Sequence, residues 1–416
     1  MDTTHFSYLP GSVQDNAPDG YHHKLSDEQQ AALSAIQAWA IEHNVDLTLL
    51  SKHALHPALT LLRYLRGNKF DVDATMRHIK DNLKWRKAMK APDVVACPDP
   101  AILLDCPVNK LTAIFPHWHC GYDLELRPVL YKQYSLFDAA AIKSIVPLDR
   151  ILRYHMWEQE VCMRLCKEQS LLTGYIVETT TTIMDLKNMR LGQVTADFLA
   201  FMRAIADVDK VQYPETLGRM IIINAPSVFP FVWRMVRIWL DPEVAAKIQV
   251  LGEEREWTPV LAGLIATQVL PTNYGGSGKT LHPWEHPYGE YMDLLEGDRE
   301  REGLAEMGLI RRGSRRGGSG TGFGSGSGLG SISESDQNMA RTISGSRDKS
   351  KSCTHAHLSP ERLYSLYSNL ASGSADRGNR EGGGSGRAGR RALPTDPALG
   401  DGVVVLHVGD DDDKHR

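Results

Sequence analysis

Apolar residues in the first part of the chain recur at spacings of three and four, which predicts amphipathic helices. Ser26 opens the first helix, and Gln29 stands three residues later as its capping-box partner. Asp71 or Asp73 caps the third helix. The three apolar stripes are Leu33, Ile36 and Ile41, then Leu59, Leu62 and Leu65 within residues 56–66, then Met76, Ile79 and Leu83. This pattern predicts a small helical domain over residues 26–90.

From residue 91 the pattern changes to short apolar or alternating runs separated by longer helical ones. Strands are predicted at residues 111–115, 128–134, 175–185, 219–224 and 247–251, and helices at residues 147–169, 195–211 and 260–266. A strand, helix, strand order implies right-handed crossovers and parallel pairing. We therefore expect an α/β fold over residues 91–285, with a mixed, largely parallel sheet flanked by helices.

The two ends of the chain differ in composition from its middle. Residues 1–25 are polar and rich in turn formers, and residues 311–416 are dominated by Gly, Ser and Arg. Such segments bury too little apolar surface to offset their conformational entropy, so we expect both to be disordered. A helical extension is expected between them and the fold, at residues 286–310. Residues 311–391 carry 14 Lys and Arg against 6 Asp and Glu, so the rest of a chain of net charge −4 is acidic.

The cysteines and the apolar segments favour a soluble cytoplasmic protein. The six cysteines form no even disulfide framework, and the first 20 residues contain no apolar signal-peptide core. Reduced thiols are the simplest interpretation. The most apolar region, residues 220–240, is interrupted by prolines and arginines, whereas a transmembrane helix needs about 20 apolar residues. Contact with a membrane is therefore expected to be peripheral.

Motifs for catalysis and metal binding are incomplete. Residues 275–280 (GGSGKT) resemble a phosphate-binding loop, but Asn273 stands where that loop needs its first glycine. No G-x-S-x-G nucleophile elbow occurs in the region expected to fold. Two pairs resemble fragments of metal sites without further ligands, namely Cys162 with Cys166 and His117 with His119. We expect a protein that is not an enzyme, has no metal or cofactor, and does not bind nucleic acid.

Residues 227–248 (SVFPFVWRMVRIWLDPEVAAKI) are the most informative segment, because the first half is apolar around nearly its whole circumference. A surface helix normally has a polar half. Two interpretations are open: a central core helix, or a mobile gate helix between a bound lipid and a bilayer, with Trp233 and Trp239 at the membrane interface. The candidate gate residues are Phe229, Phe231, Val232, Met235, Val236, Trp239 and Leu240.

Several motifs together resemble the CRAL-TRIO lipid-binding family, including the yeast phosphatidylinositol-transfer protein and its plant relatives. In chain order they are residues 61–71 (LLRYLRGNKFD), 84–87 (KWRK), 178–187 (ETTTTIMDLK), 213–225 (YPETLGRMIIINA) and 270–276 (LPTNYGG). The resemblance covers roughly residues 27–285. It implies an apolar cavity that is floored by the sheet and closed by the helix at residues 227–240, with one lipid held inside.

The resemblance also assigns candidate ligand contacts. A glutamate and a lysine that hold an inositol phosphate headgroup fall on Glu215 and Lys247. An arginine that joins them is replaced by Asn68, with Lys69 adjacent, and a threonine is replaced by Val244. The hydroxyls of a choline pocket fall on Thr180 and Thr182, whereas two tyrosines of that pocket fall on His119 and Leu130. The family's tocopherol and retinaldehyde branches suggest another set, a membrane-facing basic patch of Lys187, Arg190 and Arg219.

The expected function is lipid binding and exchange by a monomer that holds one phospholipid of the phosphatidylinositol or phosphatidylcholine class. It would be cytoplasmic, with transient association with endomembranes such as the Golgi. Two alternatives are a lipid-sensing adaptor, whose tail recruits a kinase or trafficking partner, and a carrier of a tocopherol-, retinoid- or sterol-like ligand.

Overall fold

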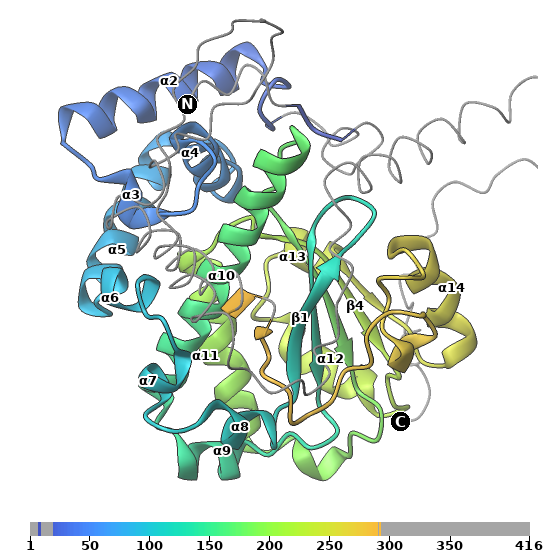
Figure 1. Cartoon of the computed structure of the whole chain (residues 1–416). Coiled ribbons are helices and arrows are strands. Elements are labelled where there is room, and N and C mark those ends of the chain that lie inside the picture. The colour runs from blue at the N-terminus through green and yellow to red at the C-terminus, as the bar shows by residue number, and fades with distance from the viewer. Residues whose placement is uncertain (1–6, 10–19, 290, 293–416) are drawn as a thin grey trace, which may run out of the picture. The chain divides into compact units, whose positions relative to one another are not determined.

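The computed structural model describes residues 7–9, 20–289 and 291–292, all within one compact unit (Figure 1). The predictions of a tail at residues 311–416 and of most of the extension at residues 286–310 lie outside these residues. The described part contains an α/β domain preceded by a group of helices, as expected.

Four helices form the first part of the fold: α2 (Asp27–Glu42), α3 (Leu47–Leu50), α4 (Pro57–Gly67) and α5 (Val72–Ala88). The capping box of Ser26 and Gln29 is present, and Asp71, not Asp73, caps α5. The predicted stripes are buried or partly buried in one core, except for Ile41. Ile41 is 78% exposed, because Trp39 and Ala40 occupy the buried side of that last turn instead.

Three short helices, α6 (Ala91–Val95), α7 (Pro100–Leu104) and α8 (Val108–Thr112), lead into the sheet. The prediction of a strand at residues 111–115 is wrong. Leu111 lies in α8, and its carbonyl accepts hydrogen bonds from the amides of Ile114 and Phe115. The pair Leu111 and Phe115 has helical spacing, so both side chains reach the same core. The first strand begins six residues later, at His117.

Within the described residues the sheet has five strands in the order β1 (His117–Tyr122), β2 (Pro128–Gln133), β3 (Thr180–Asp185), β4 (Leu217–Ile223) and β5 (Ile248–Val250). β1 and β2 are antiparallel, and the other neighbours are parallel. The structure thus confirms the mixed, largely parallel sheet.

Helices cover both faces of the sheet, as Figure 1 shows. One face, which we call the packed face, lies against α14 (Glu254–Leu264) and carries Trp118, Tyr131, Ile183, Ile221 and Ile223. The opposite face lies toward α10 (Leu148–Thr173), α11 (Ala196–Gln212) and α12 (Phe229–Arg237); the short helices α9 (Ala139–Ile145) and α13 (Pro242–Ala246) complete the fold. We call it the cavity face, because its side chains border a cavity.

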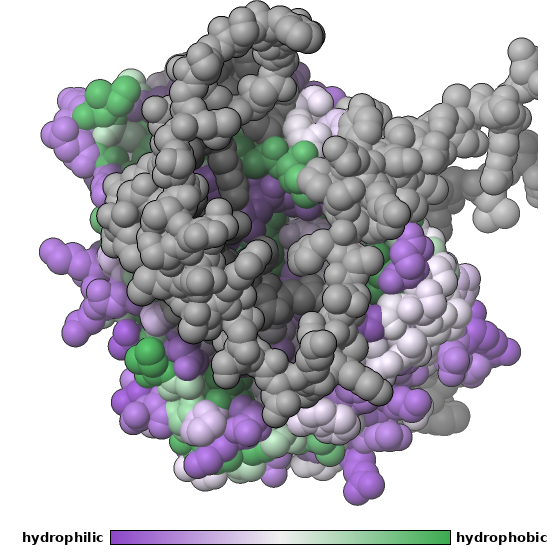
Figure 2. Space-filling model, in the orientation of Figure 1, coloured by the Kyte–Doolittle hydropathy of each residue, from purple (hydrophilic) through white to green (hydrophobic). Residues whose placement is uncertain are grey.

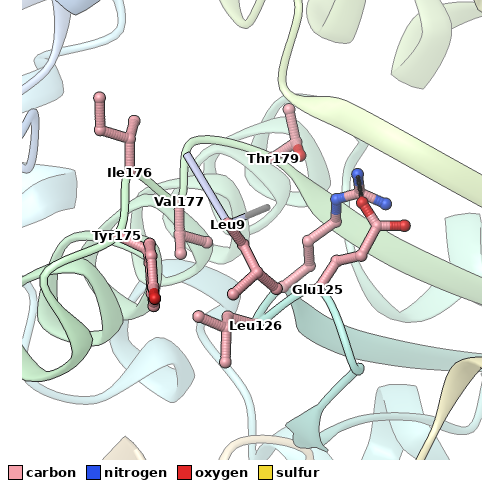
Figure 3. Close-up of a pocket in the computed structure, with 8 residues that line it drawn as sticks. Leu9, Glu125, Leu126, Tyr175, Ile176, Val177 and Thr179 are labelled. Atoms are coloured by element: carbon pink, nitrogen blue, oxygen red, sulfur yellow. Dashed lines mark hydrogen bonds and ion pairs between the residues drawn. The ribbon is translucent and has the colours of Figure 1, made fainter. Parts of the chain in front are cut away.

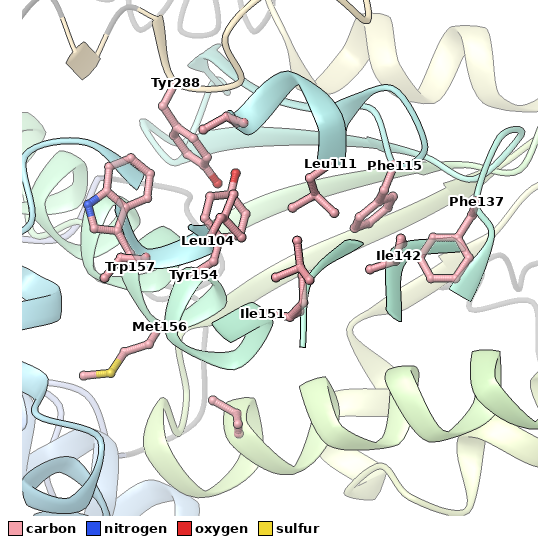
Figure 4. Packing of buried hydrophobic residues seen from close by; sticks show 14 of the residues in the cluster. Leu104, Leu111, Phe115, Phe137, Ile142, Ile151, Tyr154, Met156, Trp157 and Tyr288 are labelled. Atoms are coloured by element: carbon pink, nitrogen blue, oxygen red, sulfur yellow. The ribbon is translucent and has the colours of Figure 1, made fainter. Parts of the chain in front are cut away.

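A dense aromatic core lies beside α10 (Figure 4). Trp157 and Tyr288 meet edge to face with ring centroids 5.3 Å apart. The Tyr288 hydroxyl donates to the buried Glu158 carboxylate at 2.8 Å. Residues 286–292 therefore belong to this core as far as the structure describes them.

The first residues are also held by the fold. Ser7 pairs with Tyr175, and Leu9 lies beside Tyr175 and Leu126 (Figure 3). The crevice drawn there leaves no space for a water-sized molecule, so Leu9 fills it. Tyr8 is buried and donates to Glu178. Within the segment predicted to be disordered, residues 7–9 are held by this hydrogen bond, and Arg66 donates to the carbonyl of Gly20 at 3.2 Å.

Two buried ion pairs join the first helices to the α/β domain. Arg66 on α4 pairs with Glu178 at 2.8 Å, and Arg86 on α5 pairs with Glu160 on α10. Removing one partner of such a pair leaves an uncompensated charge, which typically costs about 3–5 kcal/mol. The two ion pairs therefore hold the first helices in a fixed position against the α/β domain.

Candidate functional site

A cavity of about 580 Å³ lies between the cavity face of the sheet and helices α10, α11 and α12. Strand residues alternate between faces, so every second one points into it. The floor consists of Leu130 and Lys132 from β2, Thr180, Thr182 and Met184 from β3, Met220 and Ile222 from β4, and Ile248 from β5. Most of this lining is apolar, as in cavities that hold hydrophobic ligands.

One end of the cavity carries the candidate headgroup residues. The Lys247 ammonium lies 3.0 Å from a carboxylate oxygen of Glu215, and both side chains are mostly buried. Asn68, Lys69 and Val244 line the same cavity. Asn68 donates to the carbonyl of Tyr64 at 2.7 Å, and Lys69 pairs with Glu243. We call this end the Glu215–Lys247 pole; its lysines already have carboxylate partners.

A second polar group lines the cavity around Lys132, and the sequence analysis did not find it. His155 and Gln159 from α10 and Asp209 from α11 lie there with Lys132. His155 Nε2 lies 2.6 Å from Asp209, and Gln159 donates to the same oxygen at 2.9 Å. We call this end the Lys132 pole. A lysine within a predicted strand and polar residues on a helix look solvent-exposed by pattern, so nothing in the sequence marks them.

Buried charges set the protonation of this pole. Burial alone lowers the pKa of His155, but the neighbouring Asp209 carboxylate outweighs it and raises the pKa to about 9. His155 is therefore protonated at neutral pH. Burial raises the pKa of Glu158, yet the nearby Lys132 and His117, together with hydrogen bonds from His117 and His155, hold it well below its usual range. Glu158 is ionised.

Helix α12 covers part of the cavity, and its side chains divide between two environments. Phe229 and Val232 are buried, and Phe229 stacks on Trp233 with centroids 6.2 Å apart. Val232, Val236, Trp239 and Leu240 line the cavity, as do Phe229 and Trp233. The arrangement excludes a helix buried on all sides. Trp233 and Trp239 line the cavity, whereas Phe231 is 57% exposed.

Known proteins share this region of the chain. Residues 115–276 match the CRAL/TRIO domain. The match includes all five strands and the cavity floor, whereas helices α2 to α8 precede it.

Several curated proteins match a longer part of the chain than this segment. The phosphatidylinositol/phosphatidylcholine transfer protein SFH12 of Arabidopsis thaliana is 31% identical over 59% of this chain and 44% of its own length. A CRAL-TRIO domain-containing protein of Saccharomyces cerevisiae is 27% identical over 71% of this chain and 92% of its own. The SEC14 cytosolic factor of Kluyveromyces lactis is 28% identical over 60% and 79%. The chain thus spans less than half of the plant relative.

Among solved structures, the crystal structure of Sfh5 matches 67% of this chain and 98% of its own chain. The TM-score is 0.48 at 15% sequence identity, which is too low to support a conclusion.

Two residues at candidate choline-pocket positions differ in their surroundings. Leu130 lines the cavity. His119 is buried, and this burial lowers its pKa to about 4, so its ring is neutral at pH 7. Its Nε2 has no hydrogen-bond partner among the described residues. Nor does any cluster of metal-ligating side chains occur in that part of the chain.

The three residues of the predicted basic patch do not come together. Arg219 pairs in register with Thr181 near the start of β3, whereas Lys187 and Arg190 follow the end of that strand. The six positions between Thr181 and Lys187 correspond to roughly 20 Å. Arg219 is also bound to Glu125 at 3.0 Å. Strand register thus separates Arg219 from Lys187 and Arg190, and the shared patch stays a prediction.

The outer surface of the fold includes exposed apolar side chains. In Figure 2 hydrophobic residues lie on the surface over α7, α8 and α9, where Ile102 and Ile145 are exposed. On α12 the exposed residues are Pro230, Phe231, Arg234 and Arg237, with Ile238 following. Within the described ranges no helix is both long enough and apolar enough to span a bilayer.

Proposed function

We propose that this chain binds one phospholipid in the cavity and exchanges it at membrane surfaces. The observation that carries the proposal is the cavity itself: about 580 Å³, mostly apolar, with polar groups at two ends, inside a CRAL/TRIO domain. Each buried methylene is worth about 0.8 kcal/mol, so a two-chain lipid would not leave into water. Exchange therefore needs a membrane at the cavity mouth.

The Glu215–Lys247 pole suits a polyhydroxyl headgroup. Because Glu215 and Lys247 neutralise each other, they offer a charged acceptor and a charged donor side by side without a net charge. An inositol ring has hydroxyls that both donate and accept. The names of the plant relatives, which cite phosphatidylinositol and phosphatidylcholine, support the phosphatidylinositol class as cargo.

Helix α12 is the proposed gate. One side lines the cavity, and the other presents Phe231 and Ile238, with Arg234 and Arg237 between them in the sequence. Apolar side chains flanked by arginines match the requirements of an anionic membrane interface. Opening of this helix against a bilayer would let the lipid pass without crossing water.

The test is transfer of a fluorescent phosphatidylinositol between vesicles, with lipid load measured by native mass spectrometry. The double variant F231A/I238A should slow transfer at least fivefold while keeping the lipid load. The matched control is Ile41→Ala on α2, because Ile41 and Ile238 are each 78% exposed. A purified chain that carries no lipid and moves none between vesicles would overturn the proposal; equal rates for both variants would overturn the gate.

A further inference from the structure

The two poles of the cavity differ in how their lysines are paired. Of the four lysines that line it in the described part of the chain, Lys247 is paired with Glu215 and Lys69 with Glu243. Lys210 is exposed to solvent. Lys132 is half-buried, and no carboxylate of a described residue lies within 4.0 Å of its ammonium. Its nearest described aromatic contact, the Phe115 ring, is 6.0 Å away.

The groups around Lys132 have other partners. Glu158 accepts from Tyr288 at 2.8 Å, and His117 and His155 lie 3.2 and 3.4 Å from its oxygens. Asp209 is occupied by His155 and Gln159. Glu158 attracts Lys132 from beyond contact distance, but neither carboxylate supplies the ammonium with a direct acceptor. A partly buried ammonium without an acceptor is costly, and an oxygen of a ligand would supply one.

The Lys132 pole is also separate from the Glu215–Lys247 pole. Lys132 pairs in register with Met184, whereas Lys247 precedes Ile248, which pairs with Met220 across the sheet. At about 3.3 Å per residue along a strand and about 4.8 Å between strands, the two lysines are roughly 15–20 Å apart. One headgroup cannot contact both.

We propose that Lys132 binds the anionic oxygen group of a second class of cargo, an acyl lipid whose headgroup is a bare phosphate or carboxylate. Such a headgroup receives a charge-assisted hydrogen bond from Lys132, with the acyl chains along Thr182, Met184 and the apolar floor. A choline headgroup is disfavoured, because it would place a quaternary ammonium beside the Lys132 ammonium, and the Asp209 carboxylate is already held by His155 and Gln159. This inference rests on the proposed function and adds a second class of cargo to it.

The test loads the full chain from vesicles that contain equal amounts of dioleoyl phosphatidic acid, phosphatidylcholine and phosphatidylinositol. Bound lipids are then counted by mass spectrometry. We expect Lys132→Met to lower the ratio of bound phosphatidic acid to phosphatidylcholine at least about tenfold, the usual value of a hydrogen bond to a charged group. Lys132→Arg should keep the ratio, and phosphatidylinositol load should not change. Lys110→Met, at an exposed lysine outside the cavity, is the control.

The outcomes separate the two proposals. An unchanged ratio in Lys132→Met overturns this inference, and so does an equal loss of all three lipids, which would indicate a structural role. A wild-type chain that takes up no lipid overturns the proposed function instead. If Lys132→Met does not fold, the wild type alone decides: it must prefer phosphatidic acid over dioleoylglycerol, or oleate over oleyl alcohol, by at least about tenfold. The oleate pair distinguishes a carboxylate from a phosphate, and absence of both preferences overturns the inference.

Discussion

Side chains alternate between the two faces of the sheet, and the faces differ in how fully the space above them is filled. On the packed face, Ile183 and Ile221 are fully buried against α14. On the cavity face, their neighbours Thr182 and Met220 border an open volume of about 580 Å³. Alternation therefore tells which residues share a face, but not whether a helix fills the space above it. In the sequence, the cavity face is distinguished by polar residues at positions that point inward.

The first prediction contrasts neighbouring residues of β4. Ile221→Ala should lower the free energy of unfolding by about 3 kcal/mol, because it leaves a hole in a filled core. Met220→Ala, on the cavity face, should lower it by less than about 1 kcal/mol, because its side chain already borders free space. Urea denaturation of the lipid-free protein measures both. Equal losses would show that the two faces are packed alike.

The second prediction concerns two threonines of β3. The Thr181 hydroxyl donates to the buried Asp123 carboxyl at 2.6 Å, so Thr181→Val should cost about 2 kcal/mol. Thr182 faces the cavity, and Thr182→Val should change stability by no more than about 0.5 kcal/mol. The same denaturation experiment applies. A large loss in Thr182→Val would indicate that its hydroxyl serves the fold rather than a ligand.

The third prediction concerns the pH dependence of the stability that His155, a residue of the cavity lining, contributes. The pKa of His155 is about 9 in the folded chain, against about 6.5 when unfolded. The contribution of His155 to the free energy of unfolding is therefore fully present below about pH 6.5 and is lost as the pH rises through 9. The stability advantage of the wild type over His155→Gln should shrink by about 1.5 kcal/mol between pH 6 and pH 10, a value reduced for the partial exposure of Asp209.

His119 provides a control of opposite sign. Burial lowers its pKa to about 4, so the neutral ring stabilises the fold above about pH 6.5 and this contribution is lost as the pH falls toward 4. The advantage of the wild type over His119→Gln should therefore shrink on acidification. Two curves with the same slope would contradict both assignments.

The smallest expected effect on stability comes from filling the cavity. Ala206 on α11 lines it, and Ala206→Trp should change the stability of the lipid-free chain by less than about 0.5 kcal/mol while at least halving the bound lipid. Overpacking of a filled core typically costs about 1–3 kcal/mol. A loss of that size in Ala206→Trp would mean that the space is closed in solution.

Local signals in the sequence predicted much of this fold. The capping box at Ser26, the cap at Asp71 and the apolar run that became β4 each act within a few residues of chain. The strand β1 (HWHCGY) was missed because it is buried on both faces and has no alternation, whereas the nearby helical pair Leu111 and Phe115 resembles a strand.

The candidate site was predictable only where a motif carried it. Glu215, Lys247, Thr180 and Thr182 line one cavity, as the resemblance implied, and their contact with a lipid remains a prediction. The Lys132 pole depends on residues from three separate elements, and its unpaired charge is a property of distances rather than of sequence. Likewise, the separation of Arg219 from Lys187 follows from strand register, which charge patterns do not encode.

The hydrogen bond from Tyr288 to Glu158 also has a consequence for folding during synthesis. The two residues are 130 positions apart, and Tyr288 is the one that leaves the ribosome last. At typical synthesis rates of about 5–20 residues per second, α10 waits roughly 6–26 s before its aromatic core can close. During that interval a buried carboxylate and the apolar floor of the sheet are open to solvent. The nascent α/β domain is thus expected to need a chaperone's protection until residues well beyond the matched segment have emerged.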